Sequence, residues 1–406
     1  MIYVHIPFCR SFCTYCDFYS EVAAKCRSFG RFADALVKEI EHRADEITDD
    51  VNTLYIGGGT PSVLPLDVFE RILDALRRCG HGGPYDEFTV EVNPEDIVEK
   101  GPGYVEGLLI LGVNRISMGV QSFDDGILKF MNRRHDAETA RKAYAILEGA
   151  GVENISIDLI FGLPQLSDVQ WQDTLDKALS ISGTGRLPKH ISSYQLSVEP
   201  RSMLARLVEK GRFEEASEEL CERQYSMLCA ALRDAGYRHY EISNFALPGY
   251  EARHNSAYWK HVPYVGFGPG AHSLVSPQSV SPTAPEGAYG LRASAEASGV
   301  ESHYSRTWNE ADLNRYLEDP MGVRDGEELT GGQVVMERIM LALRTSEGIP
   351  EEFLRMHCAP HELEHALACG NLVRIPDCHG AADAPCRLRI PEDRFFVSDS
   401  IIPNLV

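Results

Sequence analysis

The first 200 residues alternate short apolar runs with longer amphipathic stretches, and this alternation is the strongest constraint on the fold. Six runs have the composition of strands, at residues 2–6, 53–56, 88–92, 115–119, 155–160 and 190–196. Helical periodicity fills residues 29–47, 66–78, 95–111, 137–150 and 170–182. Strands that alternate with helices predict βα units and a parallel sheet. We therefore predict an α/β protein, an incomplete (β/α)6 barrel of TIM type followed by a smaller, mainly helical C-terminal domain.

The loop after the first predicted strand carries Cys9, Cys13 and Cys16 in a C-x3-C-x2-C array. Clustered thiolates select soft metal centres, and an iron-sulfur cluster with only three protein ligands keeps one iron open to another molecule. A zinc site normally has four closed ligands, and His5 is the only additional candidate nearby. The spacing favours the cluster over zinc or an accidental grouping of thiols.

Polar or glycine-rich loops follow the other predicted strands, and ligands of such folds gather where the strands end. Glycines let the backbone approach a ligand closely. The candidates on these strands and in the segments that follow them are Gly58, Gly59, Thr60, Glu91, Gln121, Arg133 and Asp158. Taken singly, each polar side chain could equally well form a structural hydrogen bond or ion pair instead of binding a ligand. Glu91, for example, could cap the next helix together with Asn93.

A second distinctive stretch begins at His254 and continues through Asn255 to Tyr258 and Trp259. A histidine can be an axial ligand of haem iron, and large flat side chains suit a porphyrin. A histidine beside aromatic residues is more often simply packed in the core or on the surface. The composition of this stretch alone does not decide between the two.

The first stretch, Tyr-x-His-Ile-Pro-Phe-Cys-x3-Cys-x-Tyr-Cys-Asp-Phe, resembles the signature of the radical S-adenosylmethionine (SAM) superfamily, in the branch of oxygen-independent coproporphyrinogen dehydrogenase and the HemW family. The resemblance implies that Cys9, Cys13 and Cys16 hold a [4Fe-4S] cluster whose fourth iron binds SAM. It also implies SAM contacts at Tyr3, Tyr15, Gly58, Gly59, Thr60, Glu91, Gln121, Arg133 and Asp158. In the dehydrogenase branch, the residues that match Gln121, Arg133 and Asp158 include contacts to a second SAM molecule.

Three features favour the HemW family within this branch. Phe18 stands where the dehydrogenase has a fourth cysteine, only eight residues precede Cys9, and residues 254–259 match the H-N-x-x-Y-W motif of HemW. The resemblance implies a haem chaperone that contacts its cargo through His254, Asn255, Tyr258 and Trp259. The family also implies delivery to acceptor haem proteins, expected to be respiratory, and a homodimer.

The alternative function is a radical SAM oxidoreductase that decarboxylates coproporphyrinogen III to protoporphyrinogen IX. Phe18 and the H-N-x-x-Y-W motif weigh against it. Whether SAM is cleaved productively, and hence whether the protein is an enzyme, stays open at this stage.

Charge and hydropathy limit the partners. The net charge of -21, from 60 acidic and 39 basic residues, disfavours nucleic acid and anionic membranes. No run approaches the roughly 18 apolar residues of a membrane span, and residue 1 starts a strand-like run rather than a signal peptide. We expect a cytoplasmic protein with at most peripheral membrane association. The chain has eleven cysteines, an odd number, which weighs against a disulfide framework.

The pattern predicts a barrel core over residues 1–200, a barrel extension with the haem motif over 201–275, a loop or insertion over 276–306 and a small domain over 307–406. Helical periodicity recurs at 214–235, 309–317 and 333–343. Near the end, His357, His361, His365 and Cys369 recur every four residues, which on one continuous helix would form a metal-binding stripe. Pro360 interrupts that helix, so solvated histidines are the favoured interpretation.

Overall fold

The computed structural model describes residues 1–23, 29–48, 52–276, 304–375 and 386–405. All six predicted strands are present, and they lie side by side as a parallel sheet. They are β1 (Ile2–Ile6), β4 (Thr53–Gly58), β5 (Glu87–Val92), β6 (Arg115–Gln121), β7 (Asn154–Phe161) and β8 (His190–Gln195). The prediction of an incomplete α/β barrel is confirmed.

Residues after position 200 extend both edges of this sheet. The short strand β11 (Val265–Phe267) pairs in parallel with β1, and the antiparallel strands β9 (Arg238–Glu241) and β10 (Asn244–Ala246) continue the sheet beyond β8. Within the described ranges, β9 and β11 form the two outer strands and do not pair with each other. The barrel is therefore open on that side.

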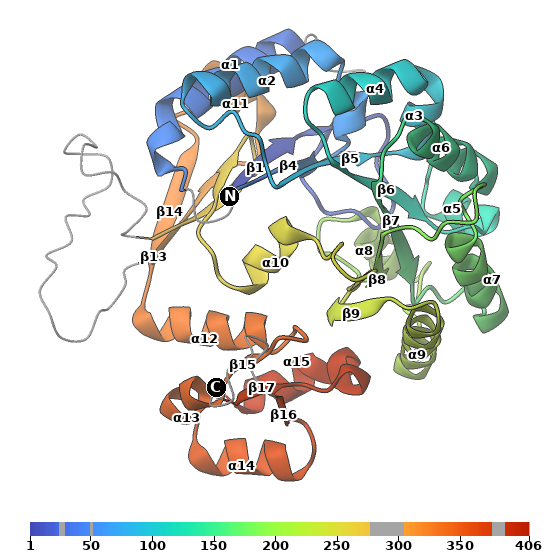
Figure 1. Cartoon of the computed structure of the whole chain (residues 1–406), viewed down its shortest axis with the longest axis vertical. Helices are drawn as coiled ribbons and strands as arrows, with labels where there is room; N and C mark the ends of the chain where they lie inside the picture. The colour runs from blue at the N-terminus through green and yellow to red at the C-terminus, as the bar shows by residue number, and fades with distance from the viewer. Residues whose placement is uncertain (24–28, 49–51, 277–303, 376–385, 406) are drawn as a thin grey trace, which may run out of the picture.

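Helices line the outer side of the sheet (Figure 1). They are α1 (Phe29–Arg43), with the 3-10 turn η2 (Ala44–Glu46) after it, α2 (Leu66–Arg78), α3 (Pro94–Lys100), α4 (Pro102–Ile110), α5 (Asp125–Phe130), α6 (Ala137–Gly149), α7 (Asp168–Leu179) and α9 (Glu218–Asp234). Helix α2 buries Phe69, Ile72 and Leu76 against the sheet, as its apolar periodicity requires. The predicted helix 95–111 is two helices, because Gly101 has a φ of 72° and Pro102 starts the second.

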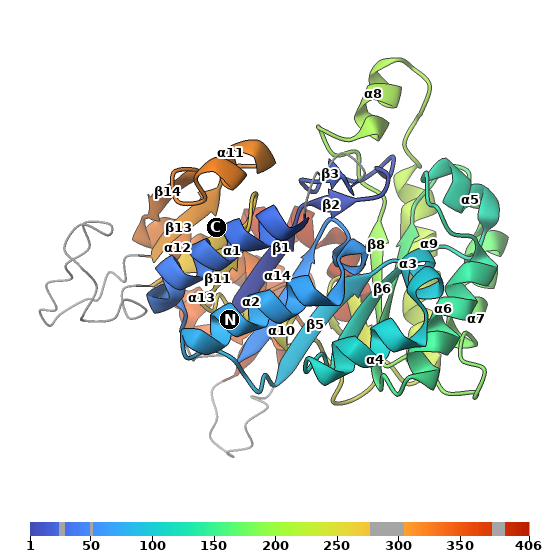
Figure 2. The same ribbon diagram turned by 90° about the horizontal axis from the view of Figure 1, so that it is seen from above.

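The cysteine loop closes one end of the barrel. Its strand β2 (Phe8–Cys9) pairs with β3 (Glu21–Val22), and Figure 2 shows both near the helix α8 (Met203–Glu209). The backbone of Thr14 is fixed on two sides: its N–H donates to Met131 O (3.1 Å), and its carbonyl accepts from Leu204 N–H (2.8 Å). The loop is thus held in place by segments that follow β6 and β8.

A second, antiparallel sheet joins β12 (His272–Val275), β13 (Tyr304–Asn309) and β14 (Arg324–Leu329), with α11 (Leu313–Glu318) between the last two. Helix α11 packs on α1, where the Tyr316 hydroxyl donates to Glu39 (2.6 Å). The predicted boundary between residues 306 and 307 falls inside β13. Residues 277–303, most of the predicted insertion, lie outside the described residues, and the domain boundaries stay predictions.

The C-terminal part is mainly helical, as predicted, and packs below α10 (Arg253–Trp259) in Figure 1. Its helices and 3-10 turns are α12 (Gly331–Ala342), α13 (Glu351–His357), α14 (Pro360–Ala368), η5 (Glu392–Val397), α15 (Ser398–Ile401) and η6 (Ile402–Asn404). A small sheet accompanies them, made of β15 (Ile349–Pro350), β17 (Arg387–Arg389) and β16 (Val373–Ile375). No helix in the described ranges is long and apolar enough to cross a membrane.

Pro360 begins α14 instead of continuing α13, so the histidines and Cys369 do not share one helix. Cys369 Sγ lies 3.5 Å from His365 Nε2 at the end of α14. Outside the segments that the structure leaves undescribed, no three His, Cys, Asp or Glu side chains are placed to share a single metal ion. The single continuous helix that a metal-binding stripe would need is therefore absent from the described part of the tail.

Candidate cofactor and ligand site

One cavity of about 1190 Å³ brings together nearly all of the residues predicted to bind a ligand. It lies where the strands of the parallel sheet end. Its lining includes Cys9, Cys13, Cys16, Tyr3, Tyr15, Gly58, Gly59, Thr60, Glu91, Gln121, Arg133, Asp158, Asn255 and Tyr258. Two predicted residues, His254 and Trp259, are not part of the lining.

The thiols of Cys9, Cys13 and Cys16 are free and half-buried in one wall of this cavity. The Thr60 hydroxyl donates to Cys9 Sγ (3.4 Å), and the Arg133 guanidinium donates to Cys13 Sγ (3.4 Å). Burial raises the pKa of Cys16 to about 12, which favours the neutral thiol. A metal centre deprotonates coordinating thiols outright, and three sulfur donors beside a cationic side chain fit an anionic iron-sulfur cluster.

The glycine loop after β4 is pressed against the base of the cysteine loop. The N–H groups of Gly59 and Thr60 donate to Ile6 O (2.8 Å) and Phe8 O (2.7 Å). A Cβ added at Gly59 would lie 2.7 Å from Phe8 O and 2.8 Å from Ile6 O. A side chain at this position would therefore displace the backbone that carries Cys9, which explains why glycine is required here.

Two half-buried carboxyl groups, Glu91 and Asp158, line the cavity. Glu91 accepts from the Tyr55 hydroxyl (2.6 Å) and from Gly58 N–H (3.0 Å), and Asp158 accepts from the Ser117 hydroxyl (3.1 Å). Burial raises the pKa of Glu91 to about 7 and that of Asp158 to about 6. Such carboxylates are suited to accept hydrogen bonds from ligand hydroxyl or amino groups.

Arg133 is fixed by neutral oxygens as well as by Cys13. Its Nη2 donates to Asn93 Oδ1 (2.8 Å) and to Gly119 O (2.7 Å). The Asn93 side chain is thereby engaged with Arg133 and makes no capping hydrogen bond to α3, and neither does Glu91. Gln121, at the irregular end of β6, has a φ of 66°, a conformation that non-glycine residues seldom adopt outside functional sites.

The histidine of the H-N-x-x-Y-W motif lies behind the cavity wall. His254 is 1% exposed, with Nδ1 hydrogen-bonded to the Thr53 hydroxyl (2.8 Å) and Nε2 to the Tyr258 hydroxyl (3.0 Å). Burial lowers the pKa of His254 to about 3, so the ring is neutral. The motif reaches the cavity through Asn255 and Tyr258, whereas both nitrogens of His254 already have partners.

The sequence analysis missed several residues that line the same cavity. Among them are Tyr194 on β8, which is 43% exposed, and the pair His272 and Trp308 on β12 and β13. His272 belongs to the glycine-rich stretch 264–273, where alternation along a strand could have placed it on one face. Trp308 carried no comparable signal, because it directly precedes a predicted helix.

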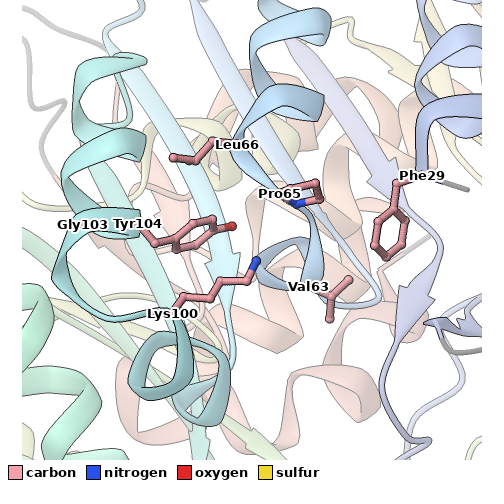
Figure 3. A pocket seen from close by; sticks show the side chains of 7 residues that line it. All are labelled: Phe29, Val63, Pro65, Leu66, Lys100, Gly103 and Tyr104. Atoms are coloured by element: carbon pink, nitrogen blue, oxygen red, sulfur yellow. The ribbon is translucent and has the colours of Figure 1, made fainter.

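A second cavity, of about 560 Å³, lies outside the barrel between α1, α2 and α4 (Figure 3). Its lining is largely apolar apart from Lys100 and Tyr104. The Lys100 ammonium donates to Leu64 O (2.6 Å) and sits 4.0 Å from the centre of the Tyr104 ring. Burial lowers the pKa of Lys100 to about 8. Its charged group is therefore engaged in holding the loop before α2, and the larger cavity is the candidate site.

Comparisons with known proteins agree with this fold and site. Residues 3–178 match the Radical SAM superfamily model. The fold is also similar to the structure of coproporphyrinogen III oxidase (HemN) from Escherichia coli, which is described as a radical SAM enzyme. The TM-score is 0.74 and the sequence identity 21%, and the match covers 99% of this chain and 89% of that chain. An open α/β barrel with a cysteine array at its mouth thus defines a protein of the radical SAM superfamily.

Two curated relatives place the chain more closely. It is 32% identical to "Heme chaperone HemW" of Synechocystis over 86% of this chain and 78% of the relative. It is also 32% identical to the protein of the same name in Bacillus subtilis, over 86% of this chain and 84% of the relative. The chain belongs to the HemW family.

Proposed function

We propose that the protein binds haem as cargo and passes it to acceptor haem proteins, and that the same cavity carries a SAM-liganded [4Fe-4S] cluster. The observation that carries this proposal is the size and lining of the cavity. Pockets for one small ligand span about 300 to 1000 Å³, whereas this cavity measures about 1190 Å³. Two parts of its lining, called here the first and second wall, come from different segments: the cysteine loop contributes three thiols, and α10 with β12 and β13 contributes Asn255, Tyr258, His272 and Trp308.

On the first wall, Cys9, Cys13 and Cys16 would hold the cluster. When bound, such a cluster would supply an iron to which the amino and carboxylate groups of SAM could coordinate. The adjoining residues Tyr3, Tyr15, Gly58, Gly59, Thr60, Glu91, Gln121, Arg133 and Asp158 are proposed to surround SAM. The half-buried carboxyl of Glu91 is proposed to accept from ribose hydroxyls, and the Arg133 guanidinium, beside Cys13, is proposed to balance negative charge.

On the second wall, Asn255 and Tyr258 are proposed to contact haem directly. His254 would act on haem through Tyr258, whose hydroxyl it holds, and Trp259 would support the same helix. Phe18, 72% exposed beside Cys16, adds an apolar surface at the mouth. An aromatic, partly open site suits a flat cargo that must be released again.

A paired assay on the full chain tests the proposal. After anaerobic reconstitution of the cluster, hemin should bind saturably, while incubation with reductant, SAM and coproporphyrinogen III should yield no protoporphyrinogen IX. Formation of that product without saturable hemin binding would contradict the function of haem carrier and support the oxidoreductase alternative.

The acceptors are proposed to be respiratory haem proteins, reached from the cytoplasm, and the chain is proposed to form a homodimer. The first point is tested by incubating hemin-loaded protein with membranes that contain the acceptor and with membranes that lack it, and measuring haem transfer to each. Transfer should require the acceptor, and equal transfer to both membranes would contradict it. Sedimentation of the cluster-loaded chain tests the second.

A further inference from the structure

We propose that His272 is the axial ligand of the haem iron and that Trp308 flanks its imidazole ring at the edge of the haem. This inference rests on the proposed function, because it names the iron ligand of the haem site proposed above. It also assigns different tasks to two histidines: His272 contacts the iron, and His254 positions Tyr258.

The antiparallel pairing of β12 and β13 directs His272 into the cavity. His272 and Trp308 are paired residues on neighbouring antiparallel strands, so their side chains share one face. Their ring centres lie 6.0 Å apart at an angle of 30°, and both side chains line the large cavity. The next residue, Ser273, is 1% exposed and faces the core, as strand alternation requires.

The ring nitrogens of His272 are available to a ligand. Among the described residues, no side chain or backbone group forms a hydrogen bond with the His272 ring. The residue is exposed and lines the cavity. His5, the other histidine that lines the cavity, is hydrogen-bonded to the Tyr3 hydroxyl (3.0 Å) and to Tyr19 O (2.9 Å). Burial and the nearby Arg306 lower the pKa of His272, which keeps the ring neutral and able to coordinate iron at neutral pH.

The two strands that carry His272 and Trp308 are held in place by hydrogen bonds of the residues that follow them, Ser273 and Asn309. The Ser273 hydroxyl accepts from Gly266 N–H (3.0 Å) and from Arg43 Nη2 (3.1 Å). On the partner strand, Asn309 Nδ2 donates to the buried carboxylate of Glu39 (2.7 Å). A ligand on rigid strands with a fixed neighbour loses little conformational entropy when it binds its target.

Hemin titration of full-length variants tests the assignment. His272→Ala should weaken hemin binding by at least about tenfold, since even indirect supports of a metal ligand cost about that much, and should shift the Soret band. Added imidazole should restore the band in His272→Gly. His361→Ala, at an exposed position on α14, is the control and should match wild type.

Hemin footprinting of the wild-type protein needs no variant. Hemin should protect His272 from diethylpyrocarbonate while His361 stays reactive. Equal modification of His272 with and without hemin, or a wild-type Soret band in His272→Ala, would overturn the assignment while leaving haem binding intact. Absence of saturable hemin binding by the wild type would instead reject both the proposed function and this inference.

Discussion

The imidazole Nε2 of His254 lies 3.0 Å from the hydroxyl oxygen of Tyr258, and the two form a part-buried pair on one turn of α10. The other ring nitrogen is bound by the Thr53 hydroxyl at the start of β4. The histidine thus connects the wall of the cavity to the parallel sheet. We conclude that the motif histidine orients Tyr258 and is not itself presented to a ligand in this structure.

His254→Ala should lower the free energy of unfolding by about 2 to 4 kcal/mol, because it removes a buried ring and leaves the Thr53 hydroxyl unpaired. It should also weaken hemin binding, since Tyr258 loses its fixed orientation, while the cluster absorbance and the position of the hemin Soret band stay unchanged. Urea unfolding and hemin titration measure the two effects.

Tyr258→Phe is the matched control for this pair. It removes one hydroxyl and should cost about 1 kcal/mol, with a smaller loss of hemin affinity than His254→Ala. Unchanged hemin affinity in His254→Ala would contradict the proposed role of the motif.

Gly59→Ala should disturb the cysteine loop, because the added Cβ would lie 2.7 Å from Phe8 O. We expect a loss of about 1 to 3 kcal/mol in unfolding free energy and a lower iron content after reconstitution. Gly103→Ala on α4 is the control: no atom lies within 4 Å of its added Cβ, and a helical Gly→Ala change gains up to about 1 kcal/mol. Equal iron content in the two variants would refute the explanation given for Gly59.

Replacing any one of Cys9, Cys13 and Cys16 by alanine should abolish the absorbance and the reduced-state EPR signal of the proposed cluster. The reason is that a [4Fe-4S] cluster cannot lose one of only three protein ligands and remain bound stably. Cys79→Ala, at the end of α2 and away from the cavity lining, is the control and should keep full iron content. A cluster retained in all three variants would exclude the site.

Glu91→Gln should change how stability depends on pH. Burial raises the pKa of Glu91 from 4.5 to about 7, so between these values the folded state holds a proton that the unfolded chain has released. The wild type therefore loses stability as the pH rises through this window. Glu91→Gln should show a shallower loss, by on the order of 1 kcal/mol, in urea unfolding at pH 5 and pH 8. Parallel curves for the two proteins would refute the raised pKa.

SAM binding should respond to the same group in the opposite direction. The ionised carboxylate is the better acceptor for ribose hydroxyls, so SAM affinity should rise as the pH increases through about 7. The Gln variant should lose most of this dependence. Calorimetric titration with SAM on cluster-loaded protein measures it, and an identical dependence in both proteins would remove Glu91 from the proposed SAM contacts.

The fold was largely predictable because parallel strands that are buried on both faces have a simple sequence pattern. The strand Ile2–Ile6 and the helix Leu66–Arg78 have the predicted bounds. The short strand Val265–Phe267 was not predicted as part of this sheet, because three residues carry too little periodicity. Its place beside β1 depends on contacts between distant parts of the chain.

The candidate site was predictable where the family signature names residues in order along the strands. The orientation of single side chains was not, because the short helix α10 could have turned His254 either toward the cavity or toward β4. The hydrogen bond to Thr53, 201 residues away in sequence, decides between them. His272 and Trp308 were missed for a related reason: their pairing joins strands on either side of the insertion.

The most direct test of the central claim is a hemin titration of the full chain after anaerobic cluster reconstitution, with iron and sulfide measured on the same sample. The account predicts saturable binding of one hemin per chain, with a shifted Soret band and an intact [4Fe-4S] cluster. Hemin absorbance that rises linearly without saturation, or hemin binding that expels the cluster, would contradict a cavity that carries both.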